Sequence, residues 1–397
     1  MRPHAIRYFP YFALALLVIA PQALATDTTV LPAATAGAMA QAASPPALAE
    51  YRRKLKEYLA ARAAFEEEAG AYWNSIAEKR RGRNAKRREH QAIALDDYVL
   101  TQPPVYTGPK RPVNPQPEAE EPREPRRERK YIPVVADLLK AAADHFQWTP
   151  QRPTSELEFK RAYASFASAA GLTREQAVRV YAFETGGNGT HASQSGFHGT
   201  HAISTAIGYN QLLTTNTVEL LAEQGHEFIK LLTERAAGLS GAARQNMEHK
   251  IAVLKKMVAL ARSVPDEWAQ HERIGDTPQG WALHAMVLDI DVGPMLQTHK
   301  LLTSVIFARA KGYMRPLSAA ELEMMNLTGD GTGLDMVTMP LAMREQVPTS
   351  NFFQRGGYER NPVAIHHNSV AKLLAVTDSR MDSMSNLPGA KELAAAF

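Results

Sequence analysis

The chain has 397 residues, a formal net charge of +4, 25 prolines and no cysteine. The lack of cysteine excludes a disulfide framework and a lipid-modified amino-terminal thiol, so stability has to come from an apolar core. With 45% apolar residues, the chain is long enough to bury one.

The first 25 residues have the pattern of a cleavable secretory signal peptide. Arg2 and Arg7 flank the start of an apolar stretch at residues 8–20, and the Ala-Leu-Ala of residues 23–25 is a small-residue cleavage site. An uncleaved membrane anchor is the alternative, but the apolar stretch is short for a membrane span and contains proline. We therefore predict a periplasmic protein, for which nucleic acid is not an expected partner.

Three segments of different composition follow the signal. Residues 26–46 are rich in Ala, Thr and Pro and are expected to be disordered. Residues 47–101 place aromatic and aliphatic side chains among charged ones, which predicts an amphipathic helix or helical hairpin and a surface for other envelope proteins. A basic cluster at residues 79–88 is interpreted as a solvated helix face, with binding to anionic cell-wall or lipid groups as the alternative. Residues 102–133 repeat proline and predict an extended spacer.

The remaining part of the chain, residues 134–397, predicts a mainly α-helical domain. Apolar residues recur at helical spacing in three stretches, at residues 132–146, 155–170 and 242–264. A further helix is expected to end near Gln224, with Gly225 just past its end. Strand signals are weak, and residues 203–213 are the best candidate for a small β-hairpin. The sequence after Pro340 permits no detailed prediction.

Glu184 is the most informative residue of this domain. Thr173 and Gln176 have the spacing of a capping box, which predicts a helix that begins at the next residue after Thr173. The residues three, four and seven positions before Glu184 are apolar, so its carboxyl group is expected on the buried face. Burial raises the pKa of a carboxyl group and favours a proton donor near neutral pH. Gly186 and Gly187 are expected to end the helix.

The composition of the next segment suggests what that acid does. No other acidic residue occurs between Glu184 and Glu219, and the intervening polar residues are mainly Gly, Ser, Thr, Asn, Gln and His. Such neutral groups can hydrogen-bond a sugar and leave one carboxyl group alone, which indicates glycosidic-bond chemistry. The alternative is that Glu184 only ends a helix, neutral or paired with an arginine.

Three motifs in the same order resemble those of the soluble lytic transglycosylase family over residues 165–335. That family carries Glu-Ser, then Gly-Leu-Met-Gln, then Tyr-Asn-Ala-Gly. The corresponding segments here are Glu184-Thr185, Gly208-Tyr209-Asn210-Gln211 and Met325-Asn326-Leu327-Thr328-Gly329.

The resemblance implies a lysozyme-like helical domain with a small β-hairpin, acting on peptidoglycan without a metal or cofactor. Glu184 would protonate the bond between N-acetylmuramic acid and N-acetylglucosamine, then deprotonate the muramoyl 6-hydroxyl and leave a 1,6-anhydro product. Gln211 and Asn326 would orient the sugar, and Tyr209 would stack on a ring. The other residues expected to bind substrate are Thr185, Ser195, Gly208 and Asn210.

Departures from the family pattern keep a second function open. Thr185 stands in place of Ser, Met325 stands in place of Tyr, and residues 226–283 form an insertion. A non-catalytic envelope protein that binds glycan or another cell-wall protein through the same scaffold is therefore the alternative.

Two other patterns contain residue types that can bind metal ions. His191, His198 and His201 share one loop, but their spacing matches no zinc motif, so polar loop histidines are expected. The segment from Asp330 to Gly333 has the composition of a calcium loop but lacks its closing acid, which predicts a turn. No metal site is expected.

Overall fold

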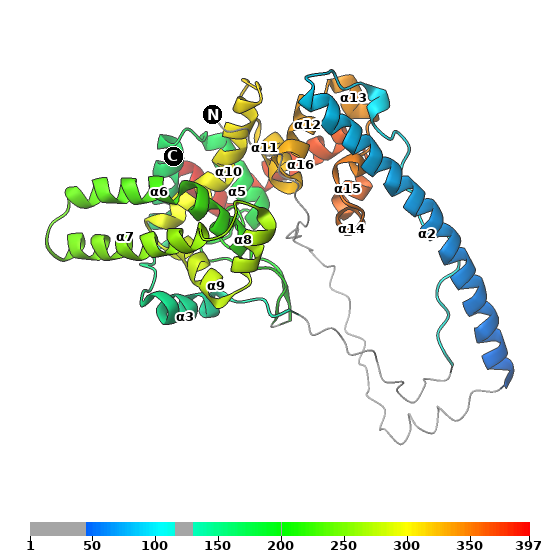
Figure 1. Cartoon of the computed structure of the whole chain (residues 1–397), viewed down its shortest axis with the longest axis horizontal. Helices are drawn as coiled ribbons and strands as arrows, with labels where there is room; N and C mark the ends of the chain where they lie inside the picture. Colours follow the sequence, from blue (N-terminus) through cyan, green and yellow to red (C-terminus); the bar gives the residue numbers. More distant parts are fainter. Residues whose placement is uncertain (1–44, 116–129, 200) are drawn as a thin grey trace. The chain divides into compact units, whose positions relative to one another are not determined.

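The computed structural model describes residues 45–115, 130–199 and 201–397 (Figure 1). The signal peptide and nearly all of the segment predicted to be disordered lie outside these residues, as does the middle of the proline-rich spacer. The described residues are mainly α-helical, as expected, and among them no helix has the length and apolarity needed to cross a membrane. They divide into two compact units, described separately below.

The smaller unit contains residues 45–115, 130–131 and 346–351. Its main element is α2 (Pro45–Arg88), a single helix of 44 residues rather than a hairpin. Its three buried residues, Ala69, Ile76 and Arg83, are seven positions apart and therefore lie in one line along the helix. A short 3-10 helix, η1 (Leu95–Asp97), follows.

The basic cluster of α2 is partly buried, which corrects the prediction of a solvated helix face. The Arg83 guanidinium lies 4.3 Å from the centroid of the Tyr98 ring and donates hydrogen bonds to the backbone oxygens of Asp97 (2.9 Å) and Asn351 (3.2 Å). Arg80 donates to the same oxygen of Asn351 at 3.0 Å. Burial lowers the pKa of both guanidinium groups, that of Arg80 to about 10. These arginines therefore bind peptide carbonyls, which satisfies buried backbone oxygens.

Asn351 joins two distant stretches of the smaller unit. Its side-chain amide donates to the Val99 carbonyl oxygen (2.8 Å) and accepts from the Val99 N–H (3.0 Å). Nearby, the hydroxyl groups of Tyr72 and Ser350 are 2.7 Å apart. Tyr106, from the described part of the spacer, packs its ring 5.4 Å from that of Phe65 of α2. Part of the spacer thus packs on the helix although it forms no helix or strand.

We predict that limited proteolysis cuts within residues 102–133 and that the amino-terminal fragment stays bound to the rest of the chain through residues 346–351. Asn351→Ala should release it at a lower denaturant concentration, because Val99 loses both hydrogen bonds at a cost of roughly 1–3 kcal/mol. Size-exclusion chromatography of the nicked protein measures this. Equal retention of the fragment by both proteins would contradict the role given to Asn351.

The chain from residue 132 onward forms two short strands and a series of helices. The strands, β1 (Phe197–His198) and β2 (His201–Ala202), are antiparallel. The helices are α3 (Val135–Phe146), α4 (Glu156–Ala169), α5 (Arg174–Thr185), α6 (Thr214–Ala237), α7 (Gly241–Ala261), α8 (Trp268–Gly275), α9 (Pro278–His284), η2 (Ala285–Leu288), α10 (Val292–Ala310), α11 (Ala319–Thr328), α12 (Asp330–Thr338), α13 (Leu341–Gln346), η3 (Thr349–Phe352), α14 (Arg355–Glu359), α15 (Pro362–His366), α16 (Val370–Ser385) and α17 (Pro388–Ala396).

Two local predictions were wrong. Residues 203–213 do not form the expected hairpin; they contain only the isolated bridge between Ile207 and Leu212, together with one from Ile207 to Gln194. The segment from Asp330 to Gly333 is the first turn of α12 rather than a loop turn. A Cβ atom on Gly333 would lie 2.3 Å from the Cα of Met325, so glycine allows α12 to pack closely on α11.

The helix expected to end near Gln224 continues to Ala237 as α6, and Gly225 lies inside it. A Cβ atom on Gly225 would lie 2.3 Å from Cγ2 of Val258 on α7. Glycine at this position therefore serves close helix packing and not helix termination. Figure 1 shows the resulting antiparallel pair of α6 and α7, whose apolar faces join the core of the larger unit.

Gly225→Ala should destabilise the protein by about 1–3 kcal/mol, because overpacking against Val258 outweighs the better helix propensity of alanine. Thermal unfolding monitored by circular dichroism measures the change. Gly82→Ala is the matched control: no atom lies within 4 Å of its added Cβ, so this helical substitution should be stabilising. Equal effects of the two substitutions would contradict the packing argument.

The carboxy-terminal helices cover the helix that carries Glu184. α16 packs on α5 and α11, and α17 packs on α4 and α5. The Ala390 N–H donates to the Gly187 carbonyl oxygen (2.9 Å), and the Gly389 N–H donates to Asn188 Oδ1 (3.0 Å). The start of α17 is thereby fixed to the loop that follows Glu184.

Candidate functional site

Glu184 lies in the last turn of α5, and the predicted capping box is confirmed. Thr173 Oγ1 accepts from the Gln176 N–H at 3.1 Å, and Gln176 Oε1 accepts from the Thr173 N–H at 3.0 Å. Gly186 ends the helix in the left-handed conformation, with φ of 64°. These two ends set the position of Glu184 on the helix and hence the direction of its side chain.

Asn326 of α11 meets Glu184 in space although the two are 142 positions apart in sequence. Its side-chain amide donates a hydrogen bond of 3.0 Å to Glu184 Oε1. The helix that carries it begins with a second capping box, formed by Ser318 and Glu321. The first and third motifs of the resemblance therefore lie together, as the resemblance implies.

Glu323, one turn before Asn326 on α11, is the acidic partner that the sequence did not predict. Its side chain has no exposed surface, and neither carboxyl oxygen accepts a hydrogen bond from an N–H or O–H group of the described residues. Its carboxyl group lies within hydrogen-bonding reach of that of Glu184. Glu184 is therefore not the lone acid expected from residues 184–219, and the site contains a carboxyl pair.

Burial dominates the electrostatics of the pair. It raises the pKa of Glu184 to about 7, although the charge of Lys300, the neighbouring Glu323 carboxyl group and the hydrogen bond from Asn326 act in the opposite direction. Burial, together with repulsion from Glu184, raises the pKa of Glu323 well above its usual range. Glu184 nevertheless keeps some exposed surface, as do Lys300 and Asn326. Glu184 can therefore exchange a proton with a bound molecule, whereas Glu323 is sealed inside.

Lys300 of α10 connects the pair to two further carboxylates. Burial lowers the pKa of its ammonium group, while Glu219 of α6, Glu184, Asp330 of α12 and Glu323 favour its charged form. Asp330 also accepts a hydrogen bond of 2.6 Å from the Ser304 hydroxyl. Four helices, α5, α6, α11 and α12, thus contribute carboxyl groups around Lys300, and its positive charge can stabilise a newly formed Glu184 carboxylate.

The second motif is built into the interior, away from solvent. The Asn210 side chain donates to the Gln297 carbonyl oxygen (2.7 Å) and to the Tyr163 hydroxyl (3.2 Å). Gln211 donates to the Gly208 carbonyl oxygen at 2.6 Å. Gly208 has φ of 85°, and a Cβ atom there would lie 2.0 Å from Gln297 Nε2. These amides bind the protein itself, so the expected contacts of Gly208, Asn210 and Gln211 with sugar are not available here.

Tyr209 is likewise a core residue. Its ring is fully buried and makes edge contacts with Phe159, Tyr163 and Tyr181 at centroid distances of 4.8 to 5.3 Å. Its hydroxyl donates to Glu156. A ring enclosed by three others presents no face to a sugar, so the predicted stacking role is inconsistent with this structure.

Thr185 and Ser195 are the two remaining residues that were expected to bind substrate. The Thr185 hydroxyl donates to the Tyr181 carbonyl oxygen (2.7 Å) one turn earlier in α5. The Ser195 N–H donates to the Ala206 carbonyl oxygen (3.0 Å), and its hydroxyl is buried without a hydrogen-bond partner among the described residues. Of the residues expected around Glu184, Asn326 is the one whose side chain hydrogen-bonds to it.

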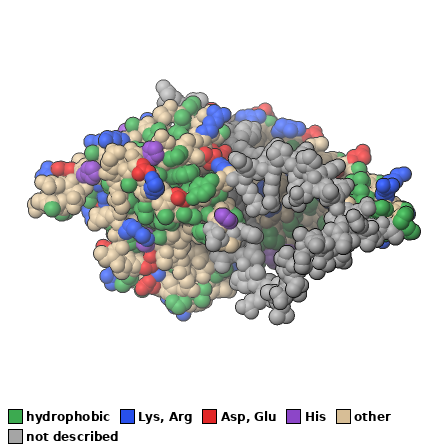
Figure 2. All heavy atoms as spheres, turned by 90° about the horizontal axis from the view of Figure 1, so that it is seen from below, with side chains coloured by type: hydrophobic (Ala, Val, Ile, Leu, Met, Phe, Trp, Pro, Cys, Tyr) green, Lys and Arg blue, Asp and Glu red, His purple; other side chains and the backbone are tan. Residues whose placement is uncertain are grey.

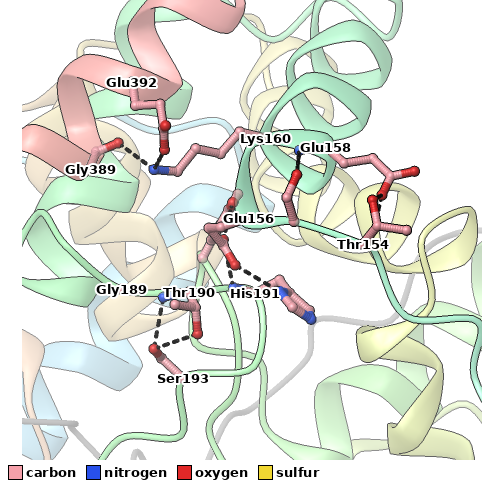
Figure 3. A network of polar contacts seen from close by, with 12 residues as sticks. Thr154, Glu156, Glu158, Lys160, Gly189, Thr190, His191, Ser193, Gly389 and Glu392 are labelled. Carbon is pink, nitrogen blue, oxygen red and sulfur yellow. Dashed lines mark hydrogen bonds and ion pairs between the residues drawn. The ribbon is translucent and has the colours of Figure 1, made fainter.

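A second buried network surrounds Glu156 (Figure 3). Its carboxylate accepts from the His191 N–H (2.9 Å), from His191 Nδ1 (2.8 Å) and from Tyr209. Burial opposes ionisation, but these bonds outweigh it and lower the pKa of Glu156. Nearby, Lys160 donates to the Gly389 carbonyl oxygen and to Glu392. This network ties the loop after α5 to α4 and α17.

The loop histidines do not assemble a metal site. His191 binds Glu156, His201 is exposed, and the side chain of His198 lies outside the described residues. No group of three or more His, Asp or Glu side chains suited to a metal ion occurs in the described part of the chain.

Comparison with known proteins adds no relative: no protein-family model, curated protein or solved structure matches this chain.

We predict that Glu184→Gln stabilises the protein at alkaline pH. Because the pKa of Glu184 is raised in the folded state, its contribution to stability is present below pH 4.5 and is lost as the pH rises to about 7. Glutamine cannot ionise and avoids this loss, so the variant should melt above the wild type at pH 8 and equally near pH 4. Glu234→Gln, on the exposed side of α6, controls for removal of one charge. A melting temperature lowered at pH 8 would contradict the burial of an ionisable Glu184.

Proposed function

We propose that the protein is an exported peptidoglycan lytic transglycosylase in which Glu184 acts as general acid and then as general base. The observation that carries the proposal is the carboxyl group of Glu184 itself. Its pKa is raised to about 7, the Asn326 amide orients it at 3.0 Å, and the residue as a whole keeps some exposed surface. A general acid with a pKa near the working pH is the most effective proton donor.

The reaction follows from one carboxyl group that gives and then regains a proton. Glu184 donates its proton to the oxygen between N-acetylmuramic acid and N-acetylglucosamine, and the bond to the muramoyl C1 breaks. The substrate's N-acetyl group stabilises the cation that develops at C1. The Glu184 carboxylate then takes the proton of the muramoyl 6-hydroxyl, whose oxygen bonds to C1 and closes the 1,6-anhydro ring. No water is consumed, and the acid is restored.

The groups around Glu184 suit both halves of this cycle. Burial keeps the carboxyl group protonated at the start, and the Asn326 amide holds one of its oxygens. Once the proton has left, the nearby charge of Lys300 stabilises the carboxylate. Hydrogen bonds and charges that are in place before the reaction cost no reorganisation when charge develops.

The face drawn in Figure 2 carries side chains of both charges. Among the described atoms visible in Figure 2, basic and acidic side chains are interspersed with apolar and neutral ones. Peptidoglycan strands are the partner proposed for the Glu184 site, and other envelope proteins are proposed as partners of residues 47–101. Periplasmic localisation remains part of the proposal and rests on the sequence of the first 25 residues.

A non-catalytic, glycan-binding or scaffold protein is the second candidate. The interior position of the second motif favours it, because Tyr209, Asn210 and Gln211 are buried and bonded within the protein. The site then offers few of the sugar-binding groups that the resemblance implies. The alternative predicts binding of sacculi without cleavage.

We predict that Glu184→Gln lowers the rate of glycan release from purified sacculi by about 100-fold or more, the usual scale of general acid catalysis. The substitution keeps the shape and the contact with Asn326 but removes the transferable proton. Glu234→Gln is the control for loss of one carboxylate and should retain the wild-type rate. Undiminished release by Glu184→Gln would refute the assignment of the general acid.

A further inference from the structure

We propose that Glu323 is held as a neutral carboxylic acid whose O–H donates a hydrogen bond to Glu184, so that Glu323 positions Glu184 and stabilises its carboxylate. The protonation state follows from the surroundings of Glu323 alone. Its consequence for catalysis rests on the proposed function.

The two carboxyl groups have unequal surroundings. Glu184 accepts a hydrogen bond from Asn326, faces Lys300 and keeps some exposed surface. Glu323 has no exposed surface, and neither of its oxygens receives a hydrogen bond from the described residues. Asn326 lies near both groups, but its side-chain amide donates its hydrogen bond to Glu184. A buried carboxylate without donors is far costlier than a buried acid, so the proton belongs on Glu323.

A neutral Glu323 also gives the buried pair a complete hydrogen bond. Two ionised carboxylates in contact repel each other, and neither can donate a hydrogen atom. With its proton in place, Glu323 becomes a donor to the neighbouring Glu184 carboxyl group. A carboxylic acid kept neutral by an apolar site so that it can donate a hydrogen bond is a known device in enzymes.

Glu323 is unsuited to be a second catalytic carboxylate. Paired glycosidase carboxyl groups are separated by roughly 5–5.5 Å in retaining enzymes and 6.5–9.5 Å in inverting ones, which leaves room for the sugar or for water between them. Glu323 instead lies within hydrogen-bonding reach of Glu184 and has no surface that a sugar or a water molecule could contact. It therefore acts through Glu184 and is a positioning residue.

The charged groups near the pair are consistent with a cycle in which only Glu184 loses and regains a proton. Lys300 of α10 supplies the positive charge, while Glu219 of α6 and Asp330 of α12 face Lys300. When Glu184 gives up its proton, its carboxylate gains the Glu323 O–H, the Asn326 N–H and the Lys300 charge. Glu323 keeps its own proton throughout, so Glu184 can regain one from a substrate hydroxyl without a second ionisation beside it.

Infrared spectroscopy of the full mature chain tests the protonation state without any substrate. At pH 8 the wild type should show a carboxylic-acid C=O band that persists in Glu184→Gln and is missing from Glu323→Gln. The comparison of the two variants assigns the band, because glutamine keeps the side-chain shape in both. A band that Glu323→Gln leaves unchanged, or no such band in the wild type, would show that Glu323 is ionised and overturn the proposal.

The ionisation midpoint of Glu184 tests the hydrogen bond, and it is followed by the loss of the carboxylic-acid C=O band of Glu184, which Glu184→Gln identifies at acidic pH, as the pH rises. Glu323→Leu removes the donor and should raise the midpoint by about one unit, whereas Glu323→Gln retains an N–H donor and should raise it less. If Glu323 were ionised, both substitutions would remove a repelling charge and lower the midpoint. Because these measurements need no activity, they can succeed even if the wild type cleaves no glycan, which would refute the proposed function alone.

Discussion

Placement of two carboxyl groups side by side among packed helices is the constraint on which the candidate site depends. Charge is expensive in such surroundings, so burial raises the pKa of both groups, that of Glu184 to about 7 and that of Glu323 well above its usual range. The same burial that raises the pKa of Glu184 also costs stability once Glu184 ionises. A buried ionisable pair of this kind is better explained by chemistry than by stability, because apolar residues would pack there without that cost.

The surrounding helices keep this arrangement in place. Two capping boxes set the starts of α5 and α11, and α16 packs against both. The loop after Glu184 is tied to α17 by hydrogen bonds from the Gly389 and Ala390 N–H groups, and to α4 through Glu156 and His191. The carboxy-terminal region, for which the sequence permitted little prediction, therefore supports the helix that carries Glu184.

Features that depend on local chemistry were predictable from the sequence. The start of α5 followed from Thr173 and Gln176, its end followed from Gly186, and the apolar face of the helix placed Glu184 toward the interior. The resemblance placed Asn326 in the same site as a residue that orients the sugar, and its hydrogen bond to Glu184 is a finding of the structure. Each of these predictions depends on a short segment or on motif order, and can therefore be made without knowing how the helices pack.

Features that depend on tertiary packing were not predictable. Glu323 has an unremarkable position in the sequence, and only the contact of α11 with α5 turns it into a partner of Glu184. Gly225 has the sequence context of a helix end, yet its function is to admit Val258 of a neighbouring helix. Tyr209 was expected to stack on a sugar ring, but three aromatic side chains from α4 and α5 surround it. The spacing of Glu323 three residues before Asn326 was the one available signal, since such residues share a helix face.

Glu184 is proposed to cleave glycan without water, and the chemistry of the new chain ends tests this most directly. Mass spectrometry of the soluble products released from purified sacculi by the wild-type protein should find 1,6-anhydromuramoyl ends. Reducing ends would contradict the transglycosylase route, because they require water activated by a group other than the sealed Glu323. The absence of new ends from sacculi that the protein still binds would contradict catalysis altogether and support the scaffold.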